Sequence, residues 1–384
     1  AAWTQAQENS KERLLFCDEL GWLHWTGARW EIADYKATES AKVYARDMLN
    51  DAAAVYAAAV KRTGGDSDLK SEKAYLKHAE NSRQKRGIDA TLSLAKPNLH
   101  VSLDDLDADG YVLNCPGGLV NLRTGKMIPH DPSQLCTHIG RCDPSDDPQE
   151  AAMWEKFLDE VTCADAESSG GALKHYLQQV AGMAAVGAVL TEKAVFLVGE
   201  GRNGKSTWLN AISTVLGDYS GVMPIEILTT SYRQQRGAIY AELKGRRLVQ
   251  GGEMERGARL SASVLKQLTS TDPLPCERKY CAPGSFTPTH SVILCSNFLP
   301  RIGSDDEGCW RRIAVVPFDA NFTGQREIKN YADVLVRKAG GAIMKWIIDG
   351  AREFIAHGGT LHEPEIVQNK TEEYRNGEDW LGNF

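Results

Sequence analysis

Apolar runs of five or six residues recur in the second half of the chain and are separated by stretches with a helical pattern. Three of these runs, at 194–198, 291–295 and 313–318, have the length and continuous hydrophobicity of strands buried on both faces of a sheet. Residues 207–216, directly after the first run, are compatible with a helix. Strands that alternate with helices in this way predict an α/β fold with a parallel sheet.

The first 95 residues have a different pattern, because helical periodicity dominates them. The stretch 41–60 is alanine-rich and amphipathic. The stretch 69–87 is rich in basic residues, namely Lys70, Lys73, Lys77, Arg83, Lys85 and Arg86. Between 111 and 130 the pattern changes to short strands and turns. We expect a helical module followed by a small β-containing segment. A basic helix can contact duplex DNA, but most basic stretches of this kind are solvated helix faces, and that is the preferred interpretation.

A polar linker at 143–148 ends this N-terminal part, and residues 153–189 return to a helical pattern. These transitions predict three segments. A mainly helical α+β domain covers 1–165, an α/β core covers 166–322, and a small helical segment covers 323–384.

Composition adds few constraints. The chain has 384 residues, 42% hydrophobic and 25% charged, as in an ordinary globular protein of two or three domains. The longest apolar stretch, 180–190, is far shorter than the roughly 20 residues that span a bilayer, so we expect no membrane segment. The net charge of −7 argues against a protein that coats nucleic acid, although basic loops can still bind phosphates.

The cysteines give a prediction about the compartment. There are nine, an odd number, and no C-x-x-C pair occurs. This pattern predicts neither a zinc site nor a disulfide framework, and it fits a reducing environment. The cytoplasm is therefore the expected location.

The strongest single motif follows the first apolar run. Residues 199–206 read Gly-Glu-Gly-Arg-Asn-Gly-Lys-Ser, a complete G-x-x-x-x-G-K-[ST] loop between a predicted strand and a predicted helix. Glycines let backbone N–H groups close around phosphates, the lysine brings a positive charge to the β- and γ-phosphates, and the serine hydroxyl ligates magnesium. We therefore expect ATP and Mg²⁺ as cofactors. The residues expected to bind them are Gly199, Gly201, Asn203, Gly204, Lys205, Ser206 and Thr207.

Acids that could act with this loop lie downstream. Glu253 ends the stretch 246–253, where a second core strand should deliver a carboxylate to magnesium and to the attacking water. Glu255 lies two residues further on, and the division of labour between the two acids stays open. A pair of surface carboxylates is the alternative.

Two later positions also have residue types that suit ATP hydrolysis. Asn297 follows the apolar run at 291–295, where an amide can sense the γ-phosphate and orient water; a plain strand-end turn is the alternative. Arg311 and Arg312 precede the run at 313–318. An arginine there can reach the γ-phosphate of a neighbouring subunit, and a structural salt bridge is the alternative.

Two other interpretations are weaker. The segment 105–110 matches the first half of an EF-hand loop, but its twelfth position is Pro116 instead of Glu, so we expect a turn. A P-loop GTPase or small-molecule kinase shares the loop motif. Guanine recognition requires N-K-x-D, and the nearest string, at 369–372, ends in Glu372.

The combined motifs resemble those of superfamily 3 helicases, and most closely the poxvirus-type and phage or plasmid primase-helicase family. In chain order the motifs are the loop at 199–207, Glu253, Lys-Gln-Leu-Thr at 266–269, Ser-Asn at 296–297 and Trp-Arg-Arg at 310–312. The stretch 113–125 resembles the helicase-associated N-terminal domain of that family. The resemblance extends from about residue 15 to the end of the chain.

The resemblance implies an AAA+ type P-loop ATPase that forms a ring, usually of six subunits. Such a protein translocates on single-stranded DNA with 3′-to-5′ polarity during phage, plasmid or viral DNA replication. By position, Lys205 and Ser206 hold ATP and magnesium, Glu253 activates water and assists at the metal, and Asn297 senses the γ-phosphate. The location implied is the cytoplasm of a bacterial host or a viral replication compartment.

The same resemblance implies partners. Arg312 acts on the neighbouring subunit of a homo-hexamer, with Arg311 as the second candidate. Single-stranded DNA, replication forks, and a primase domain or primase partner are the further partners. An AAA+ assembly switch, or an origin-binding ATPase that binds DNA without unwinding it, is the alternative function.

A hairpin that grips DNA is also implied, at 275–286. Basic residues beside an aromatic suit contact with phosphates and bases, so Lys279 is the first candidate, with Arg278 and Tyr280 beside it. Arg278 in a structural ion pair and Tyr280 in the core are the alternatives.

The ends of the chain suggest a piece of a longer protein. It begins without an initiating Met and without a signal-peptide pattern, and no carboxylate triad of a primase centre is visible. Members of the family that this chain resembles often carry a primase domain upstream, and we expect this chain not to be the primase part. The stretch 372–380 resembles the approach to a winged-helix region that stops at Phe384.

Overall fold

Two compact units make up the chain. In this computed structural model the described residues are 13–65, 69–163, 169–232, 236–277, 284–302, 306–323 and 328–378. The first unit comprises 1–108 and 131–137, and the second comprises 109–130 and 138–384. These two units have other boundaries than the three segments predicted from the sequence. The three segments remain a prediction of functional domains.

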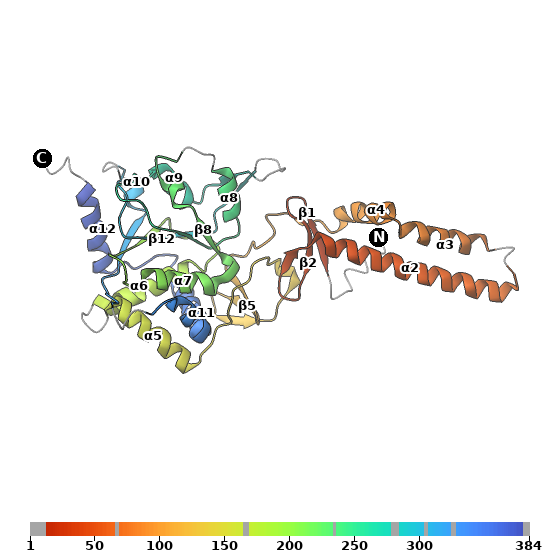
Figure 1. Ribbon diagram of the computed structural model, residues 1–384, viewed down its shortest axis with the longest axis horizontal. Helices are drawn as coiled ribbons and strands as arrows, with labels where there is room; N and C mark the ends of the chain where they lie inside the picture. The colour runs from red at the N-terminus through yellow and green to blue at the C-terminus, as the bar shows by residue number, and fades with distance from the viewer. Residues whose placement is uncertain are drawn as a thin grey trace. The chain divides into compact units, whose positions relative to one another are not determined.

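The first unit combines a small antiparallel sheet with long helices (Figure 1). Its elements are β1 (Leu14–Cys17), β2 (Gly21–Trp25), β3 (Trp30–Ile32), α2 (Asp34–Thr63), α3 (Lys70–Ser82), α4 (Lys85–Ala95), η1 (Lys96–Asn98) and η2 (Pro132–Gln134). The expected helices are present, and the expected basic stretch is divided between α3 and α4. Buried alanines, among them Ala37, Ala41, Ala45 and Ala52, line one face of α2 and allow the other helices to approach closely.

The second unit is built on a five-stranded sheet. Its strands are β7 (Ala194–Val198), β8 (Ser220–Met223), β9 (Leu248–Gly251), β12 (Ser291–Ser296) and β13 (Ile313–Pro317). Their order is β13-β7-β12-β9-β8, and every neighbouring pair is parallel. The prediction of an α/β fold with a parallel sheet is therefore confirmed. In register, Ser296 and Pro317 both lie beside Val198, so these strands end at the same edge.

Both faces of this sheet are covered, which explains why its strands are continuously apolar. In β7, Val195 and Leu197 belong to one hydrophobic core, and Ala194 and Phe196 belong to the other. The helices packed in the first core are α5 (Pro148–Thr162), α6 (Ser169–Met183), α7 (Lys205–Leu216) and α11 (Tyr331–Ala356). Those in the second are α8 (Gly237–Leu243), α9 (Ala262–Leu268) and α10 (Glu307–Trp310), with η4 (Ile225–Leu228).

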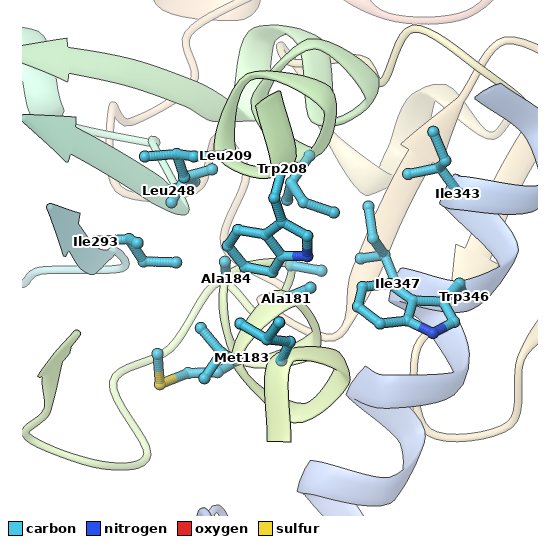
Figure 2. Packing of buried hydrophobic residues seen from close by; sticks show 14 of the residues in the cluster. Ala181, Met183, Ala184, Trp208, Leu209, Leu248, Ile293, Ile343, Trp346 and Ile347 are labelled. Carbon is cyan, nitrogen blue, oxygen red and sulfur yellow. The ribbon is translucent and has the colours of Figure 1, made fainter. Parts of the chain in front are cut away.

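Trp208 of α7 occupies the middle of the first core. Its side chain is fully buried, and Figure 2 shows the indole between Ala181 of α6, Ala184 just after that helix, Ile347 of α11 and Leu248 of β9. Contacts on several sides fix the position of α7. The loop that precedes this helix is therefore held against the sheet edge.

The remaining elements surround this core. They are β4 (Val112–Cys115), β5 (Gly118–Asn121), β6 (Lys126–Ile128), η3 (Gly217–Tyr219), β10 (Leu274–Cys276), β11 (Gly284–Phe286) and α12 (Glu365–Glu378). The strands β4, β5 and β6 form an antiparallel sheet in the stretch where short strands are predicted. Among the helices that the structure describes, none is long and apolar enough to cross a membrane.

The small sheet joins the second unit through buried polar contacts. Arg247 donates to the carbonyl of Val112 at 2.6 Å, and the Asn114 N–H donates to the Tyr219 hydroxyl at 3.0 Å. A Cβ at Gly110 would lie 2.4 Å from the carbonyl oxygen of Gly187, so the two backbones touch there. These contacts account for the placement of 109–130 with the C-terminal part.

Candidate nucleotide-binding site

The predicted phosphate loop lies at the carboxyl end of β7, an interior strand of the sheet. The chain leaves β7 toward the side occupied by β12, β9 and β8, and it returns on the other side of β7 as β13. The strand order therefore reverses at β7. In open α/β sheets, ligands bind outside the carboxyl ends of the strands at such a switch point.

The loop requires its glycines. Gly201 and Gly204 have φ angles of 95° and 85°, in the left-handed region that favours glycine. A Cβ at Gly199 would lie 1.9 Å from Nδ2 of Asn203 and 2.3 Å from the carbonyl oxygen of Phe318. Helix α7 then begins at Lys205 with no side-chain cap, so its first N–H groups are available for an anion.

Lys205 is the centre of the site. Its side chain is 4% exposed, and its Nζ donates to Oδ1 of Asn297 at 2.6 Å and to the carbonyl of Gly199 at 3.0 Å. Burial lowers the pKa of the ammonium group, while the negative charge of Glu253 acts in the opposite direction. A buried ammonium with neutral partners is suited to receive an anion.

Asn297 connects Lys205 to the predicted acid. Its Nδ2 donates to Oε1 of Glu253 at 2.7 Å, while its Oδ1 accepts from Lys205. Lys205 follows β7, Glu253 follows β9, and Asn297 follows β12. The structure thus brings together three predicted residues from three strand ends. Glu255 is exposed on the same segment as Glu253.

Asn203 anchors the loop. Its side chain is 2% exposed, and its Nδ2 donates to the carbonyl of Phe318 at 2.9 Å, just after β13. Its Oδ1 lies 3.5 Å from Nζ of Lys205. Two backbone bonds, from Phe318 to Val198 and from Phe322 to Arg202, join the same segments. The segment after β13 therefore holds the loop, which sequence reasoning missed.

The two hydroxyl residues of the motif differ in exposure. Ser206 is exposed, and Thr207 is partly buried. The Ser206 hydroxyl hydrogen-bonds Cys295, the fifth residue of β12. Burial raises the pKa of the Cys295 thiol to about 12, so it is neutral at physiological pH. Ser206 therefore rests against a neutral thiol at the carboxyl edge of the sheet.

The two predicted arginines lie at the opposite edge. Arg312 is 7% exposed, and it donates to Oε2 of Glu192 at 2.6 Å and to the carbonyl of Gly308 at 2.7 Å. Arg311 donates to the same carboxylate at 3.2 Å, but its side chain is 66% exposed. Because β13 separates them from the loop by roughly 15 Å, neither can reach the site of its own chain.

Glu192 is the residue at this edge that sequence reasoning missed. It precedes β7 and accepts hydrogen bonds from both arginines, which lie about 120 residues later. The only sequence signal for Glu192 is its charge beside an apolar run.

Lys266, in the Lys-Gln-Leu-Thr motif, forms an ion pair with Asp306 at 2.5 Å, just before α10.

The predicted DNA-contacting residues Lys279, Arg278 and Tyr280 lie outside the described residues. The strands on either side are described: β10 pairs with β11 antiparallel, with Cys276 opposite Gly284. These strands are the two sides of the predicted hairpin. The segment 105–110 contains turns, and the Asp107 carboxylate accepts from the backbone N–H of Thr137 at 2.8 Å.

Comparison with known proteins gives matches to two family models. The model described as D5 N terminal like matches residues 5–163, and that of a family of unknown function, DUF5906, matches residues 197–312. A protein of Acanthamoeba polyphaga mimivirus named as a helicase is 26% identical over 307 residues, which is 73% of this chain and 31% of that protein. A protein of African swine fever virus named as a primase is 27% identical over 226 residues, which is 55% of this chain and 22% of that protein.

Solved structures give a likeness of fold. The apo structure of the C-terminal region of NrS-1 has a TM-score of 0.51 and 11% identity, and the match covers 97% of this chain and 74% of that one. This chain spans less than a third of the length of the two viral relatives.

The parallel sheet and the residues at its carboxyl edge define an α/β protein with a candidate ligand site at a switch point. Within that class the chain carries a D5 N-terminal-like domain and is homologous to viral primase-helicase proteins, as its motifs predict.

Proposed function

We propose that this chain is the motor part of an ATP-dependent DNA helicase. In this proposal it is an AAA+ type P-loop ATPase of superfamily 3, assembles as a ring of six copies, and moves along single-stranded DNA in the 3′-to-5′ direction. It acts in phage, plasmid or viral DNA replication beside a primase domain or partner, in the cytoplasm or a viral replication compartment. The contact of Lys205, Asn297 and Glu253 at one sheet edge carries the proposal.

The network suggests how hydrolysis is linked to binding. In this structure Lys205 donates a hydrogen bond to Asn297, and Asn297 in turn donates one to the Glu253 carboxylate. When ATP is bound, Lys205 exchanges the Asn297 amide for phosphate oxygens. Asn297 is then free to contact the γ-phosphate, and Glu253 is free to accept a proton from water. The acid is thereby restrained until nucleotide is present.

The donor set fits magnesium. Ser206 and Glu253 both present exposed oxygen atoms at the carboxyl edge, and Mg²⁺ prefers oxygen ligands with several positions left for water and phosphate. Magnesium would neutralise charge on the phosphates. The chain's own residues bind the nucleotide, orient it and remove the proton.

For the arginine that acts on a neighbouring subunit, exposure favours Arg311. A finger must leave its own chain, and the Arg311 side chain is 66% exposed, whereas Arg312 is buried between Glu192 and Gly308. The sequence resemblance names Arg312 as the first candidate for this role, whereas the exposure of the two side chains favours Arg311. In this proposal Arg312 keeps the segment in place.

We expect Arg311→Ala to slow hydrolysis in the assembled protein on the order of 100-fold, because the mutation removes a cation from the neighbour's phosphate. Subunits with Arg311→Ala keep an intact loop, and subunits with Lys205→Ala keep an intact arginine. Mixing the two should restore part of the turnover measured by phosphate release. If mixtures that co-assemble do not recover turnover, Arg311 does not act across an interface. If mixtures made with Arg312→Ala subunits recover turnover and those made with Arg311→Ala subunits do not, Arg312 is the arginine that acts on the neighbouring subunit.

The experiment that tests the proposed function measures ATPase activity against protein concentration, with and without single-stranded DNA, together with mass by light scattering. We expect turnover to rise with a hexamer-sized species and to increase with DNA. Strand displacement on 3′-tailed and 5′-tailed forks then tests the direction. Hydrolysis by a DNA-indifferent monomer would contradict the motor, and DNA-stimulated hydrolysis without strand displacement would support an assembly switch.

A further inference from the structure

The α3–α4 stretch has a charge opposite to that of the chain as a whole. Residues 69–96 contain seven Lys or Arg and three Asp or Glu, whereas the chain has a net charge of −7. Lys96 is used locally, since its Nζ lies 4.2 Å from the centre of the Phe16 ring. The other six cations lie at 70–86, and all of them are exposed.

These cations face away from the helix packing. At 100° per residue, Lys70, Lys73 and Lys77 fall within about 60° of one another around α3, and the buried Ala79 lies on roughly the opposite side. Tyr75, between the two directions, donates its hydroxyl to Asp51 of α2 at 2.9 Å. The lysines are therefore spread along about 10 Å of an outward helix face. Arg83, Lys85 and Arg86 continue the positive charge where α3 meets α4.

Five of these cations have no acidic partner among the residues that the structure describes. Across the described residues, no carboxylate is within ion-pair distance of Lys70, Lys77, Arg83, Lys85 or Arg86. Several lysines of the second unit are paired: Lys174 with Glu155 at 2.8 Å, Lys193 with Glu363 at 2.7 Å, and Lys345 with Asp349 at 2.5 Å. The positive charge of these five residues is not neutralised by the described part of the chain, so it is available to an anionic partner.

We propose that this surface, consisting of Lys70, Lys73, Lys77, Arg83, Lys85 and Arg86, binds the phosphate backbone of duplex DNA. It is called the basic face below. The rigid helices hold the charges in a row, which suits the regular charge density of a duplex, with one phosphate per about 1.7 Å of axis. This inference concerns a second DNA surface and does not depend on the phosphate loop.

Duplex fits better than single strand because the basic face lacks a stacking surface. Single-strand grooves combine cations with aromatic side chains on which bases stack. The aromatic residue within 69–87 is Tyr75, which is partly buried and bonded to Asp51. The basic face therefore offers charge without base recognition, and the binding should be independent of sequence.

The test compares two triple variants of the full chain. One carries Lys70→Gln, Lys77→Gln and Lys85→Gln. The matched control carries Lys36→Gln, Lys42→Gln and Arg46→Gln on α2, where Lys36 and Arg46 have the local acidic neighbours Glu39 and Asp47. Glutamine is nearly as good a helix former as lysine, so both variants should keep wild-type circular dichroism.

Binding is measured without nucleotide by anisotropy of a labelled duplex of about 30 base pairs between 50 and 200 mM salt. We expect the slope of log K against log salt to fall by about 2 to 3 in the basic-face variant, since each phosphate contact contributes about 0.9, and its binding at 100 mM salt to weaken on the order of 100-fold. The control variant should retain the wild-type slope. Because ATP is absent, a chain that fails to hydrolyse ATP still reports on this surface.

Four outcomes would overturn the proposal. An unchanged slope in the basic-face variant removes these residues from the DNA path. An equal loss in the control variant shows a general charge effect. A loss for single-stranded DNA as large as that for duplex, or a loss for vesicles of anionic lipid with no change for DNA, assigns the basic face to another partner.

Discussion

Replacement of Lys205 by alanine should reduce ATP hydrolysis on the order of 10³-fold. Lys205 is buried, and its only described partners are Gly199, Asn203 and Asn297. Alanine removes the charge that balances the γ-phosphate in a site where water is scarce, so the electrostatic loss is larger than at the surface. It also removes the hydrogen bond that Oδ1 of Asn297 accepts from the lysine. Phosphate release at saturating ATP measures the effect.

The residue before β7 supplies a matched control. Lys193 immediately precedes β7 at the other edge of the sheet and forms an ion pair with Glu363 at 2.7 Å. Lys193→Ala therefore removes a partly buried lysine from the other end of β7 without touching the loop. We expect nearly wild-type turnover in this variant. Turnover retained by Lys205→Ala, or lost equally in both variants, would overturn the assignment of the loop.

The strands of the large sheet are predictable from sequence where they are buried on both faces. The runs at 194–198, 291–295 and 313–318 correspond to β7, β12 and β13 almost residue for residue. By contrast, β8 lies at one edge of the sheet and is not covered on both faces, as the 70% exposure of Val222 shows, so it lacks a continuous apolar pattern. The short, tryptophan-rich strands β1 to β3 are also not predicted, because a strand of three to five residues is too short to show a clear periodicity.

The candidate site is predictable as a set of residues but not as a network. Parallel strands end at one edge, so the positions of Lys205, Glu253 and Asn297 after their strands are enough to bring them together. The anchoring of Asn203 to Phe318 depends on a backbone carbonyl 115 residues later, which no local pattern reveals. The pairing of Glu192 with Arg311 likewise depends on two strands lying side by side.

Replacement of Glu253 by glutamine should also slow hydrolysis on the order of 10³-fold, while nucleotide binding persists. Glutamine keeps the shape and an oxygen that can accept from Nδ2 of Asn297, which now lies 2.7 Å from Oε1 of Glu253. What it loses is the negative charge and the ability to take a proton from water. Binding of a fluorescent ATP analogue and single-turnover hydrolysis separate the two effects.

Glu255 is the matched control that decides between the two acids. Both side chains are exposed and lie two residues apart on the segment after β9, so Gln at either position removes the same charge from nearly the same place. A general change of electrostatic potential would slow both variants alike. If Glu253 is the base, only Glu253→Gln loses the chemical step, because Glu253 is the acid that Asn297 links to Lys205. Loss in Glu255→Gln with turnover retained in Glu253→Gln would reverse the assignment and would leave the Asn297 contact as a structural bond.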